Sequence, residues 1–391
     1  MQCARLSVRI AVLPYISSMN KKILITGNEA IAEGAIQAGC RFYAGYPITP
    51  QNELTAYFAK RMPEVKGIFI QAESELAAIN MVFGAAAAGV RAMTSSSSPG
   101  ISLKQEGISY IAGAELPAVI VNVMRGGPGL GNIAPSQSDY FQATRSGGHG
   151  DYHSIVLAPS TVQEAYDFMF LAFNSADKYR IPVIVLADGM LGQMMEPIFV
   201  PRSSFLVPRE ENKRTTNHEP RTTKKWALTG CKGRKPNIIK SFYIKEGDLE
   251  KFNLTLQKKY KRIQEDEQRY EGLFLDEAKI ILVAYGSMAR IAKSVVNRLR
   301  EKGKKIGLIR PITLWPFPKD VFKRFLPASR QGAISAQRLA FLVVEMSYGQ
   351  MLEDVRLAVD GKCPIEFLGR SGGGIPTEEE IINKVRKFQR T

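Results

Sequence analysis

Three side chains of this 391-residue chain have a type and a setting that suit anion binding or proton transfer: Thr49, Glu75 and Arg125. Thr49 lies in the pentapeptide YPITP (residues 46–50), between a short apolar run and an amphipathic run. This order predicts a strand and a turn, then a helix with Thr49 as its N-cap and Pro50 in its first turn. A helix N-terminus at the carboxyl edge of a parallel sheet suits a bound anion. An ordinary helix cap has the same pattern, so the pentapeptide alone does not establish a site.

Glu75 opens an expected helix, residues 75–88, in which no further charge occurs before Arg91. This pattern predicts a helix that is buried nearly all round. A carboxylate at the head of such a helix is costly unless a donor pairs with it, so Glu75 is a candidate for proton transfer. The alternative is a first-turn glutamate that the helix dipole stabilises, and Glu73 fits that alternative better.

Arg125 ends an expected strand, residues 118–124, and is followed by a glycine run at residues 126–131. This position suits a bidentate clamp on a carboxylate or phosphate, although a salt bridge at the rim of the sheet is an equal alternative. Residues 129–134 satisfy a dinucleotide-binding fingerprint, but Pro135 falls where the following helix should run. The pattern therefore argues against nicotinamide binding.

The other reactive side chains do not form recognisable sites. The three histidines, His149, His153 and His218, lack the spacing of a zinc site. Asp151, close to His149, belongs to a polar segment that either faces a cleft or forms an ordinary turn, and the ordinary turn is favoured. The cysteines are scattered, which argues against an iron–sulfur cluster held by this chain alone and indicates a reducing compartment: Cys3, Cys40, Cys231 and Cys363.

The elements that must position these residues alternate between short apolar runs and helical patterns from residue 22 to about residue 196. Such alternation predicts a parallel sheet with helices on both faces. Ser98-Pro99 and the pair Ser160 and Gln163 add two expected helix starts. The expected strands are residues 22–26, 42–45, 67–71, 90–94, 118–123, 154–157 and 182–187.

A second, smaller α/β unit is expected near the carboxyl end, with strands at residues 279–284, 305–309 and 341–345 and a closing helix at residues 378–387. Between the two units the alternation fails, and a charged helical run occupies residues 249–270. The sequence thus predicts four parts: an N-terminal extension (1–20), a catalytic domain (21–196), a basic connector with a helix (197–276) and a second domain (277–391).

Charge and hydropathy limit the kinds of partner. The formal net charge is +16, and residues 209–240 hold ten Lys or Arg against three Glu. Because Trp226 is the only aromatic residue in that run, a solvated connector is favoured over a nucleic-acid interface. As a partner of the run, an acidic protein is more plausible than a nucleic acid. No apolar run is long enough to span a bilayer. The residues before Met19 carry Arg5 and Arg9 without a cleavage site, and we interpret them as upstream sequence of a cytoplasmic protein.

Five motifs occur in a specific order along the chain: Tyr46-Pro47-Ile48-Thr49-Pro50, Gln71-Ala-Glu-Ser-Glu75, Arg125-Gly-Gly-Pro128, Gln137-Ser-Asp139 and Arg310-Pro-Ile-Thr-Leu-Trp-Pro-Phe-Pro318. Together they resemble the alpha subunit of 2-oxoacid:ferredoxin oxidoreductases. Within that family the chain is most similar to the branched-chain 2-oxoisovalerate (3-methyl-2-oxobutanoate) type. The resemblance extends from about residue 22 to residue 387.

This resemblance implies a pyrimidine-binding-type domain of thiamine-diphosphate enzymes followed by a transketolase-C-terminal-like domain. It also implies a cofactor shared between chains, because a beta subunit would hold Mg²⁺ and the diphosphate. Gamma and ferredoxin-like delta subunits would carry the iron–sulfur clusters. The sequence agrees with this division, since the Gly-Asp-Gly…Asn signature for metal and diphosphate is absent and only Asp188-Gly189 imitates its start.

The resemblance further implies roles for individual residues. Glu75 would bond N1′ of the aminopyrimidine, beside Tyr46 and Pro47, while Thr49 and Arg125 would bind the substrate carboxylate. The implied reaction is oxidative decarboxylation of a 2-oxoacid to acyl-CoA and CO₂, with ferredoxin as the electron acceptor. The substrate is expected to be 3-methyl-2-oxobutanoate, with 2-oxoglutarate or pyruvate as alternatives. A non-catalytic assembly subunit with the same fold is the alternative of another class.

Overall fold

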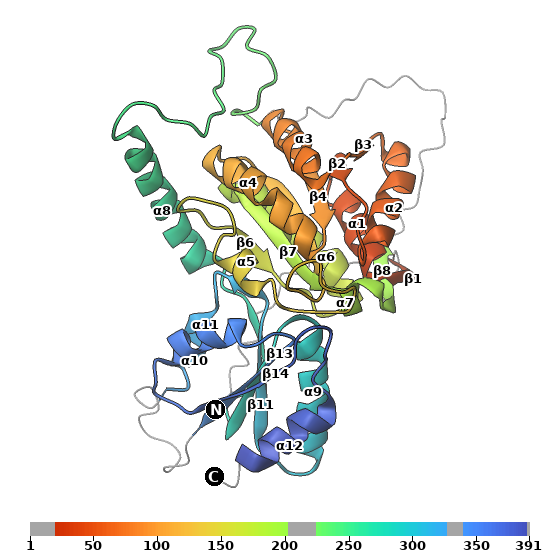
Figure 1. The fold of residues 1–391 in the computed structure, drawn as a ribbon, viewed down its shortest axis with the longest axis vertical. Coiled ribbons are helices and arrows are strands. Elements are labelled where there is room, and N and C mark those ends of the chain that lie inside the picture. Colours follow the sequence, from red (N-terminus) through yellow and green to blue (C-terminus); the bar gives the residue numbers. More distant parts are fainter. Residues whose placement is uncertain (1–19, 202–223, 327–338, 389–391) are drawn as a thin grey trace.

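The computed structural model describes residues 20–201, 224–326 and 339–388. Figure 1 shows two α/β units, a larger one above and a smaller one below, in direct contact. The expected N-terminal extension up to residue 19, His218 and residues 209–223 of the basic run lie outside the described residues. No described helix is both long enough and apolar enough to cross a membrane.

The larger unit is built on a seven-stranded sheet, and its parallel core confirms the predicted fold class. The strand order is β12-β6-β7-β5-β4-β2-β3, and every neighbouring pair is parallel except β12 with β6. All seven residues of the two central strands β5 and β7 are buried, as expected for parallel strands covered on both faces. The strands are β2 (Phe42–Gly45), β3 (Ile68–Gln71), β4 (Ala92–Ser96), β5 (Ala118–Met124), β6 (Ile155–Leu157), β7 (Pro182–Asp188) and β12 (Thr313–Trp315).

Helices cover this sheet in packed pairs. Helix α1 packs on α6 and on α2, and helix α3 packs on α4. Glycines allow close approach at these contacts; for example, a Cβ atom at Gly107 of α4 would lie 2.5 Å from Ile79 of α3. The helices of this unit are α1 (Gly27–Gln37), α2 (Asn52–Arg61), η1 (Pro63–Val65), α3 (Glu75–Ala87), α4 (Ser98–Gly113), α5 (Tyr140–Thr144), α6 (Val162–Tyr179) and α7 (Gly189–Gln193).

The prediction that residues 22–26 form a strand of the parallel sheet is wrong. They belong to β1 (Asn20–Thr26), which pairs antiparallel with β8 (Met195–Pro201) in a separate two-stranded sheet. The physical reason is that buried and exposed side chains alternate along this strand: Ile25 is buried, whereas Leu24 is 65% exposed. One solvated face is typical of antiparallel pairs and rare in covered parallel sheets.

The smaller unit has a five-stranded sheet in the order β14-β13-β10-β11-β9. Its strands β10, β11 and β13 match the three that the sequence predicts, whereas β9 and β14 were not predicted. The strands are β9 (Tyr270–Leu273), β10 (Ile280–Val283), β11 (Ile306–Pro311), β13 (Ala340–Glu345) and β14 (Ile365–Gly369), and the helices are α9 (Gly286–Glu301), α10 (Lys319–Lys323), α11 (Gln350–Val359) and α12 (Glu378–Phe388).

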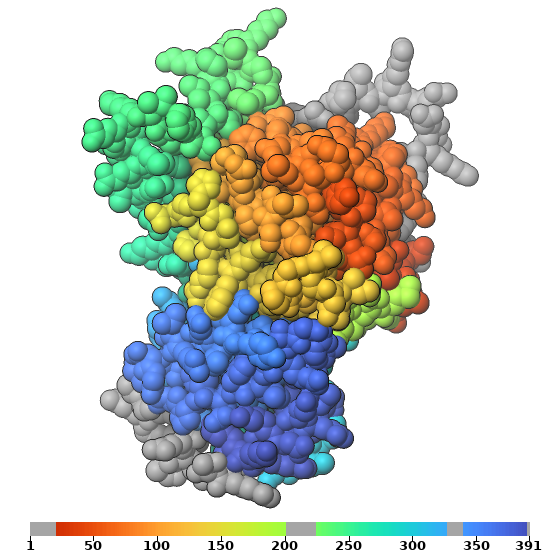
Figure 2. Space-filling model, in the orientation of Figure 1, coloured from red at the N-terminus to blue at the C-terminus, as the bar shows by residue number. Residues whose placement is uncertain are grey.

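The two units are joined by shared structure as well as by contacts. Strand β12 follows β11 along the chain but pairs with β6 of the larger sheet. The side chain of Gln137 donates to the Tyr285 carbonyl and accepts from the Met346 N–H, both at 2.9 Å. The blue lower unit therefore abuts the yellow segment in Figure 2. The residue boundaries predicted for the domains stay a prediction.

The described part of the connector, from residue 224 onward, runs as an extended loop into α8 (Asp248–Asp266), as Figure 1 shows in green. Helix α8 ends earlier than the predicted helical run. In the loop, the large apolar side chains Ile238, Phe242 and Ile244 are 75–87% exposed.

Candidate active site

The turn between β4 and α4 is where the predicted site residues meet. Serines 95–98, which form this turn, are all buried. On one side, the Ser96 hydroxyl donates to Oε1 of Glu75 at 3.4 Å. On the other side, the Ser98 hydroxyl accepts from the backbone N–H of Arg125 at 3.0 Å. The structure thus brings Glu75 and Arg125 to opposite sides of one turn at the carboxyl edge of the parallel sheet.

The carboxylate of Glu75 is buried, with a relative exposure of 5%. Ser74 caps α3 because its hydroxyl accepts from the Ala77 N–H at 3.1 Å, which fixes the start of the helix. A Cβ atom at Gly100 would lie 2.4 Å from Glu75 Oε1, so only glycine leaves room for the carboxylate. Within the described residues, Oε2 of Glu75 has no hydrogen-bond partner and no cation within 4.0 Å. The carboxylate therefore keeps an accepting oxygen for a ligand.

The prediction that α3 is buried nearly all round is wrong. Leu76, Asn80 and Gly84 form an exposed stripe at helical spacing. Apolar composition does not by itself place a side chain inside, since small residues are tolerated on an outer helix face. Burial does separate the two candidate glutamates, because Glu73 is exposed whereas Glu75 is buried.

Arg125 links the glycine run to the pentapeptide 46–50. Its guanidinium donates from Nη1 to the Thr49 carbonyl at 3.0 Å and from Nη2 to the Leu130 carbonyl at 3.1 Å. The side chain is 7% exposed, and its Nε is buried without a hydrogen bond in the described chain. Arg125 and Thr49 are therefore neighbours, and among the described residues no carboxylate contacts the arginine and neutralises it.

The prediction that Thr49 caps α2 is wrong. The helix begins at Asn52 with Gln51 as its N-cap, and no side chain caps it. The start is delayed because Gln51 is fully buried, with its amide nitrogen bonded to the Tyr46 carbonyl and its oxygen to Ser95. The Thr49 hydroxyl therefore makes no bond to the helix backbone, and only the side-chain nitrogen of Asn52 donates to it, at 3.4 Å.

Two other expected helix starts are displaced by one residue. Ser97 is the N-cap of α4, so that Ser98 is freed for its bonds to Arg125. Thr161 is the N-cap of α6, where its hydroxyl accepts from the Glu164 N–H. In both cases the adjacent hydroxyl has long-range partners that local sequence does not reveal.

A buried polar network supports the pentapeptide from behind, and the sequence did not reveal it. Oη of Tyr43 is bonded to Ser95 at 2.7 Å and to Thr55 at 3.0 Å, and both hydroxyls donate to the Gln51 amide oxygen. Burial raises the pKa of Tyr43 to about 12, so the phenol stays neutral. The network fixes the turn against β4 and leaves Tyr46 and Pro47 exposed at its tip.

Lys104, on α4, is a second feature that the sequence interpretation missed. Its side chain is fully buried, and Nζ donates to Thr94 Oγ1 at 3.1 Å and to the Glu75 carbonyl at 3.4 Å. Burial lowers the pKa of Lys104 to about 7, and the nearby Glu75 charge opposes that change. The signal was present in the sequence, because residue 104 falls in the apolar stripe of Ile101, Ile108 and Ile111.

Two buried aspartates near the site have structural partners. Asp139 accepts from Ser98 at 2.6 Å and from Asn122 at 2.9 Å, and burial raises its pKa. Asp188 caps α7 and accepts from the Ser287 hydroxyl at 2.8 Å, and burial raises its pKa as well. Because its lone pairs are used within the chain, Asp188 does not act as the start of a metal signature.

The glycine run behaves as the sequence predicts, since no helix follows it directly. The next helix, α5, starts at Tyr140. The run instead packs against the smaller unit, where Asn132 donates to the Gly372 carbonyl at 3.0 Å. The described residues contain no group of three or more His, Cys, Asp or Glu that could hold a metal ion. Of the two described histidines, His153 stacks on Trp315 with ring centroids 4.5 Å apart.

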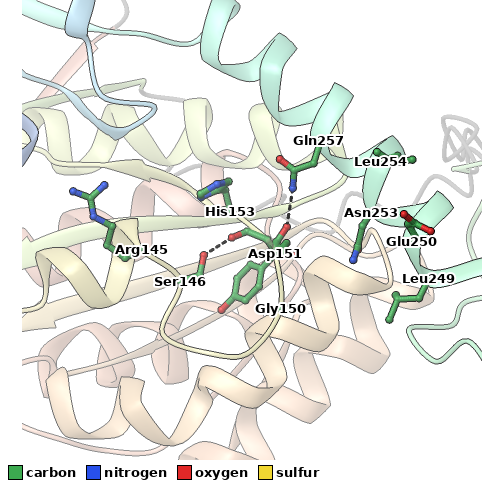
Figure 3. A pocket seen from close by; sticks show the side chains of 11 residues that line it. Arg145, Ser146, Gly150, Asp151, His153, Leu249, Glu250, Asn253, Leu254 and Gln257 are labelled. Atoms are coloured by element: carbon green, nitrogen blue, oxygen red, sulfur yellow. Dashed lines mark hydrogen bonds between the residues drawn. The ribbon is translucent and has the colours of Figure 1, made fainter. Parts of the chain in front are cut away.

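A shallow hollow of about 700 Å³ lies elsewhere, between the segment 145–153 and α8 (Figure 3). Asp151, one of its lining residues, accepts from Gln257 through its backbone carbonyl at 3.1 Å. Arg145 is paired with Asp354 at 2.9 Å. None of Thr49, Glu75 and Arg125 lines this hollow, so it is separate from the site at the β4–α4 turn.

Comparison with known proteins agrees with this arrangement. Residues 33–254 match the thiamine-diphosphate-binding family of pyruvate flavodoxin/ferredoxin oxidoreductases. Residues 278–381 match core domain II of pyruvate:ferredoxin oxidoreductase. The chain belongs to the 2-oxoacid:ferredoxin oxidoreductase family. This confirms the family that the five ordered motifs indicate.

Several members of the 2-oxoacid:ferredoxin oxidoreductase family are similar over nearly the whole chain. Ketoisovalerate oxidoreductase subunit VorB of Methanothermobacter thermautotrophicus is 48% identical over 93% of this chain and 97% of its own length. 2-Oxoglutarate synthase subunit KorA of the same organism is 38% identical over 95% of this chain and 100% of its own length. The solved 2-oxoglutarate:ferredoxin oxidoreductase from Magnetococcus marinus, with 2-oxoglutarate, coenzyme A and succinyl-CoA bound, has a TM-score of 0.78 and 29% identity. That match covers 94% of this chain but 65% of the solved chain.

The residues present fit one end of the family's cofactor. The buried residue Glu75, whose Oε2 atom has no partner in the described chain, suits a protonated ring nitrogen that donates a hydrogen bond. The described residues offer no comparable place for the diphosphate and its metal, because Asp188 is engaged in capping α7. The chain is thus suited to the pyrimidine end and lacks, in its described part, the donor set for the other end.

Proposed function

We propose that this chain is the alpha subunit of a thiamine-diphosphate-dependent 2-oxoacid:ferredoxin oxidoreductase that converts 3-methyl-2-oxobutanoate (ketoisovalerate) and CoA to the branched acyl-CoA and CO₂ while reducing ferredoxin. The observation that carries the proposal is the buried carboxylate of Glu75 on the same turn as the Arg125–Thr49 contact. The substrate follows the relatives, since those named for ketoisovalerate share 48% identity and those named for 2-oxoglutarate share 37–40%.

The work is divided among several chains in this proposal. A beta subunit holds Mg²⁺ and the diphosphate, and gamma and ferredoxin-like delta subunits carry the iron–sulfur clusters that pass electrons to ferredoxin. Two observations support the division: the described residues hold no metal-ligand cluster, and the cysteines of the chain have no cluster spacing. The relatives VorB and KorA are themselves named as subunits.

Glu75 is the residue that sets the protonation of the cofactor. Bound thiamine diphosphate supplies the electron sink on which a 2-oxoacid is decarboxylated. When the cofactor is bound, the Oε2 atom of Glu75 would accept a hydrogen bond from a protonated pyrimidine N1′, and the burial of the carboxylate would strengthen that bond. Ser96 donates to Oε1 and Gly100 leaves room for it, so that the other oxygen remains for the ligand. Tyr46 and Pro47 lie at the exposed tip of the neighbouring turn and would contact the ring.

Arg125 and Thr49 bind the substrate carboxylate. The guanidinium has a fixed position because two carbonyl groups hold its terminal nitrogens, and it has no carboxylate partner of its own. Its positive charge and the Thr49 hydroxyl attract and orient the carboxylate of the 2-oxoacid until CO₂ leaves. Both residues were singled out as an anion site by their positions after strands.

The alternatives differ from this proposal in what the site requires. An enzyme for 2-oxoglutarate needs a further cation for the second carboxylate, whereas a branched-chain enzyme needs an apolar pocket. A non-catalytic assembly subunit needs neither a buried carboxylate with one oxygen left for a ligand nor a glycine that accommodates it. The site at the β4–α4 turn therefore favours a catalytic subunit.

The proposal is tested with the complex reconstituted from this chain and its partner subunits. We expect ferredoxin reduction with a panel of 2-oxoacids to be highest for 3-methyl-2-oxobutanoate, and the isolated chain to be inactive. Turnover by the isolated chain would show that the site is not shared. Glu75→Gln should lower kcat by at least about a hundredfold, because the hydrogen bond to N1′ loses its anionic acceptor. Glu73→Gln is the matched control, since Glu73 is exposed, and it should keep near-normal activity.

A further inference from the structure

Lys104 is placed where a lysine is unfavourable for folding. It lies on α4 within the contact of α3 and α4, and its side chain has 0% exposure. A buried ammonium must be hydrogen-bonded and balanced by an opposite charge, or folding is penalised. An apolar side chain of similar length at this position would carry no such penalty. The presence of a charge here therefore suggests a role in the site rather than in packing.

The contacts of Nζ connect Lys104 to the residue that faces the cofactor. The ammonium donates to the Thr94 hydroxyl on β4 and to the backbone carbonyl of Glu75, the first residue of α3. These two bonds use two of its three protons. They tie the head of α3 to β4 and α4, so that the backbone from which the Glu75 carboxylate projects is held in place.

Glu75 is also the nearby charge that balances Lys104. Nζ contacts β4 and α3, and its helix α4 also packs against β5 and β7. Strands β4 and β5 have no ionisable side chain, and Glu75 is the only ionisable group on α3. On β7 the ionisable group is Asp188, which accepts from Ser287. On α4 the other ionisable groups are Glu106, which is exposed, and Tyr110, to which Glu106 is bonded. The Glu75 charge is the one that acts on Lys104 among the described residues.

We propose, on the basis of the function proposed above, that Lys104 is a positioning residue that fixes Glu75 at the head of α3, so that its carboxylate faces the pyrimidine nitrogen. The two groups form a buried acid–base pair that is joined through the Glu75 backbone. Lys104 does not touch the cofactor or the substrate. It acts through Glu75, by geometry and by charge.

The main test compares kcat and KM of the reconstituted complex between the wild type and Lys104→Met, an apolar replacement of similar length. Without the two bonds of Nζ, the backbone that carries Glu75 is no longer held, whereas the contact of Arg125 with Thr49 is unchanged. We expect kcat to fall at least about tenfold while KM for the 2-oxoacid changes less than about twofold. Lys60→Met, a change on the exposed face of α2, is the matched control and should retain the wild-type values. A Lys104→Met complex with the wild-type kcat would overturn the proposal.

A second measurement needs no turnover and uses the full chain without partners or cofactor. A double-mutant cycle combines Lys104→Met with Glu75→Gln and follows the unfolding equilibrium at pH 6.5. We expect the effect of Glu75→Gln on the unfolding constant to differ at least about fivefold between the two backgrounds. Equal effects would overturn the pairing. Lys104→Gln, which keeps a donor for both acceptors, is measured in parallel in case Lys104→Met does not fold.

The two measurements separate the failure of this inference from the failure of the proposed function. If the complex oxidises no 2-oxoacid, the proposed function is wrong, and the cycle still decides whether Lys104 and Glu75 interact. If the complex is active, Lys104→Met leaves kcat unchanged and the cycle shows no coupling, only the role of Lys104 is wrong.

Discussion

The pH dependence of stability should reveal the buried lysine directly. The pKa of Lys104 falls from 10.5 to about 7 on folding, because the ammonium is buried. Below pH 7, both the folded and the unfolded chain hold this proton. Between pH 7 and 10.5 the unfolded chain keeps the proton and the folded chain loses it. Stability therefore rises with pH in this window, and the penalty for burying the charge is greatest below pH 7.

The size of the effect follows from the same values. Each pH unit in which only the unfolded chain holds the proton adds about 1.4 kcal/mol to the free energy of unfolding. Because Lys104 is partly protonated at pH 7, the expected gain between pH 7 and pH 9 is about 2 kcal/mol. Lys104→Met removes this contribution and leaves every other titrating group in place. The difference between wild type and variant should therefore change by about 2 kcal/mol over this interval, in favour of the wild type at high pH.

The assay is urea unfolding of the full chain, followed by circular dichroism at pH 7, 8 and 9, for wild type, Lys104→Met and the exposed control Lys60→Met. The m-values of the variants must agree, so that midpoints report stability. The control should follow the wild type at all three pH values. If the difference between wild type and Lys104→Met stays constant to within about 0.5 kcal/mol, Lys104 keeps an ordinary pKa and the reasoning is refuted.

Two further predictions concern other contacts of the fold. Gly100→Ala places a Cβ atom 2.4 Å from Glu75 Oε1, so we expect kcat of the complex to fall at least about tenfold while the chain still folds. Gly84→Ala, whose Cβ meets nothing within 4 Å, is the control. Equal kcat values for the two variants would contradict the prediction. The buried Arg310 pairs with Glu164 through two guanidinium nitrogens that lie 2.6 and 2.7 Å from the carboxylate oxygens. Arg310→Met removes this pair and should lower the free energy of unfolding, measured by urea titration, by about 3 kcal/mol. A loss below about 1 kcal/mol would show that the pair is no stronger than a surface ion pair.

The sequence predicts best where local pattern and burial coincide. Strands β5 and β7 are continuous apolar runs, and both are fully buried in the sheet. Strand β14 was missed because every residue of it is only half-buried, so that it shows no apolar periodicity. Strand β12 was missed because three residues are too few to show a pattern, and its pairing with β6 is a long-range contact.

The site shows the same division between local and long-range information. The order of a strand, a turn and a helix around Thr49 was correct, since that order depends on neighbours in sequence. The identity of the N-cap was not, because Gln51 is held by Ser95, which lies 44 positions further along the chain. Lys104 could have been found, because it interrupts the apolar stripe of α4. Its contact with Glu75, however, depends on how two helices pack.

Strand β12 bears on the order in which the molecule can be completed during synthesis. The larger sheet ends at β6 on one side, and β12 covers that edge with residues more than 150 positions later in the chain. Until the ribosome has released Trp315, the backbone groups along this side of β6 have no partner strand. A fragment that stops at residue 276 has the same open edge and should tend to aggregate. Expression of the larger unit therefore requires the chain to continue past β12.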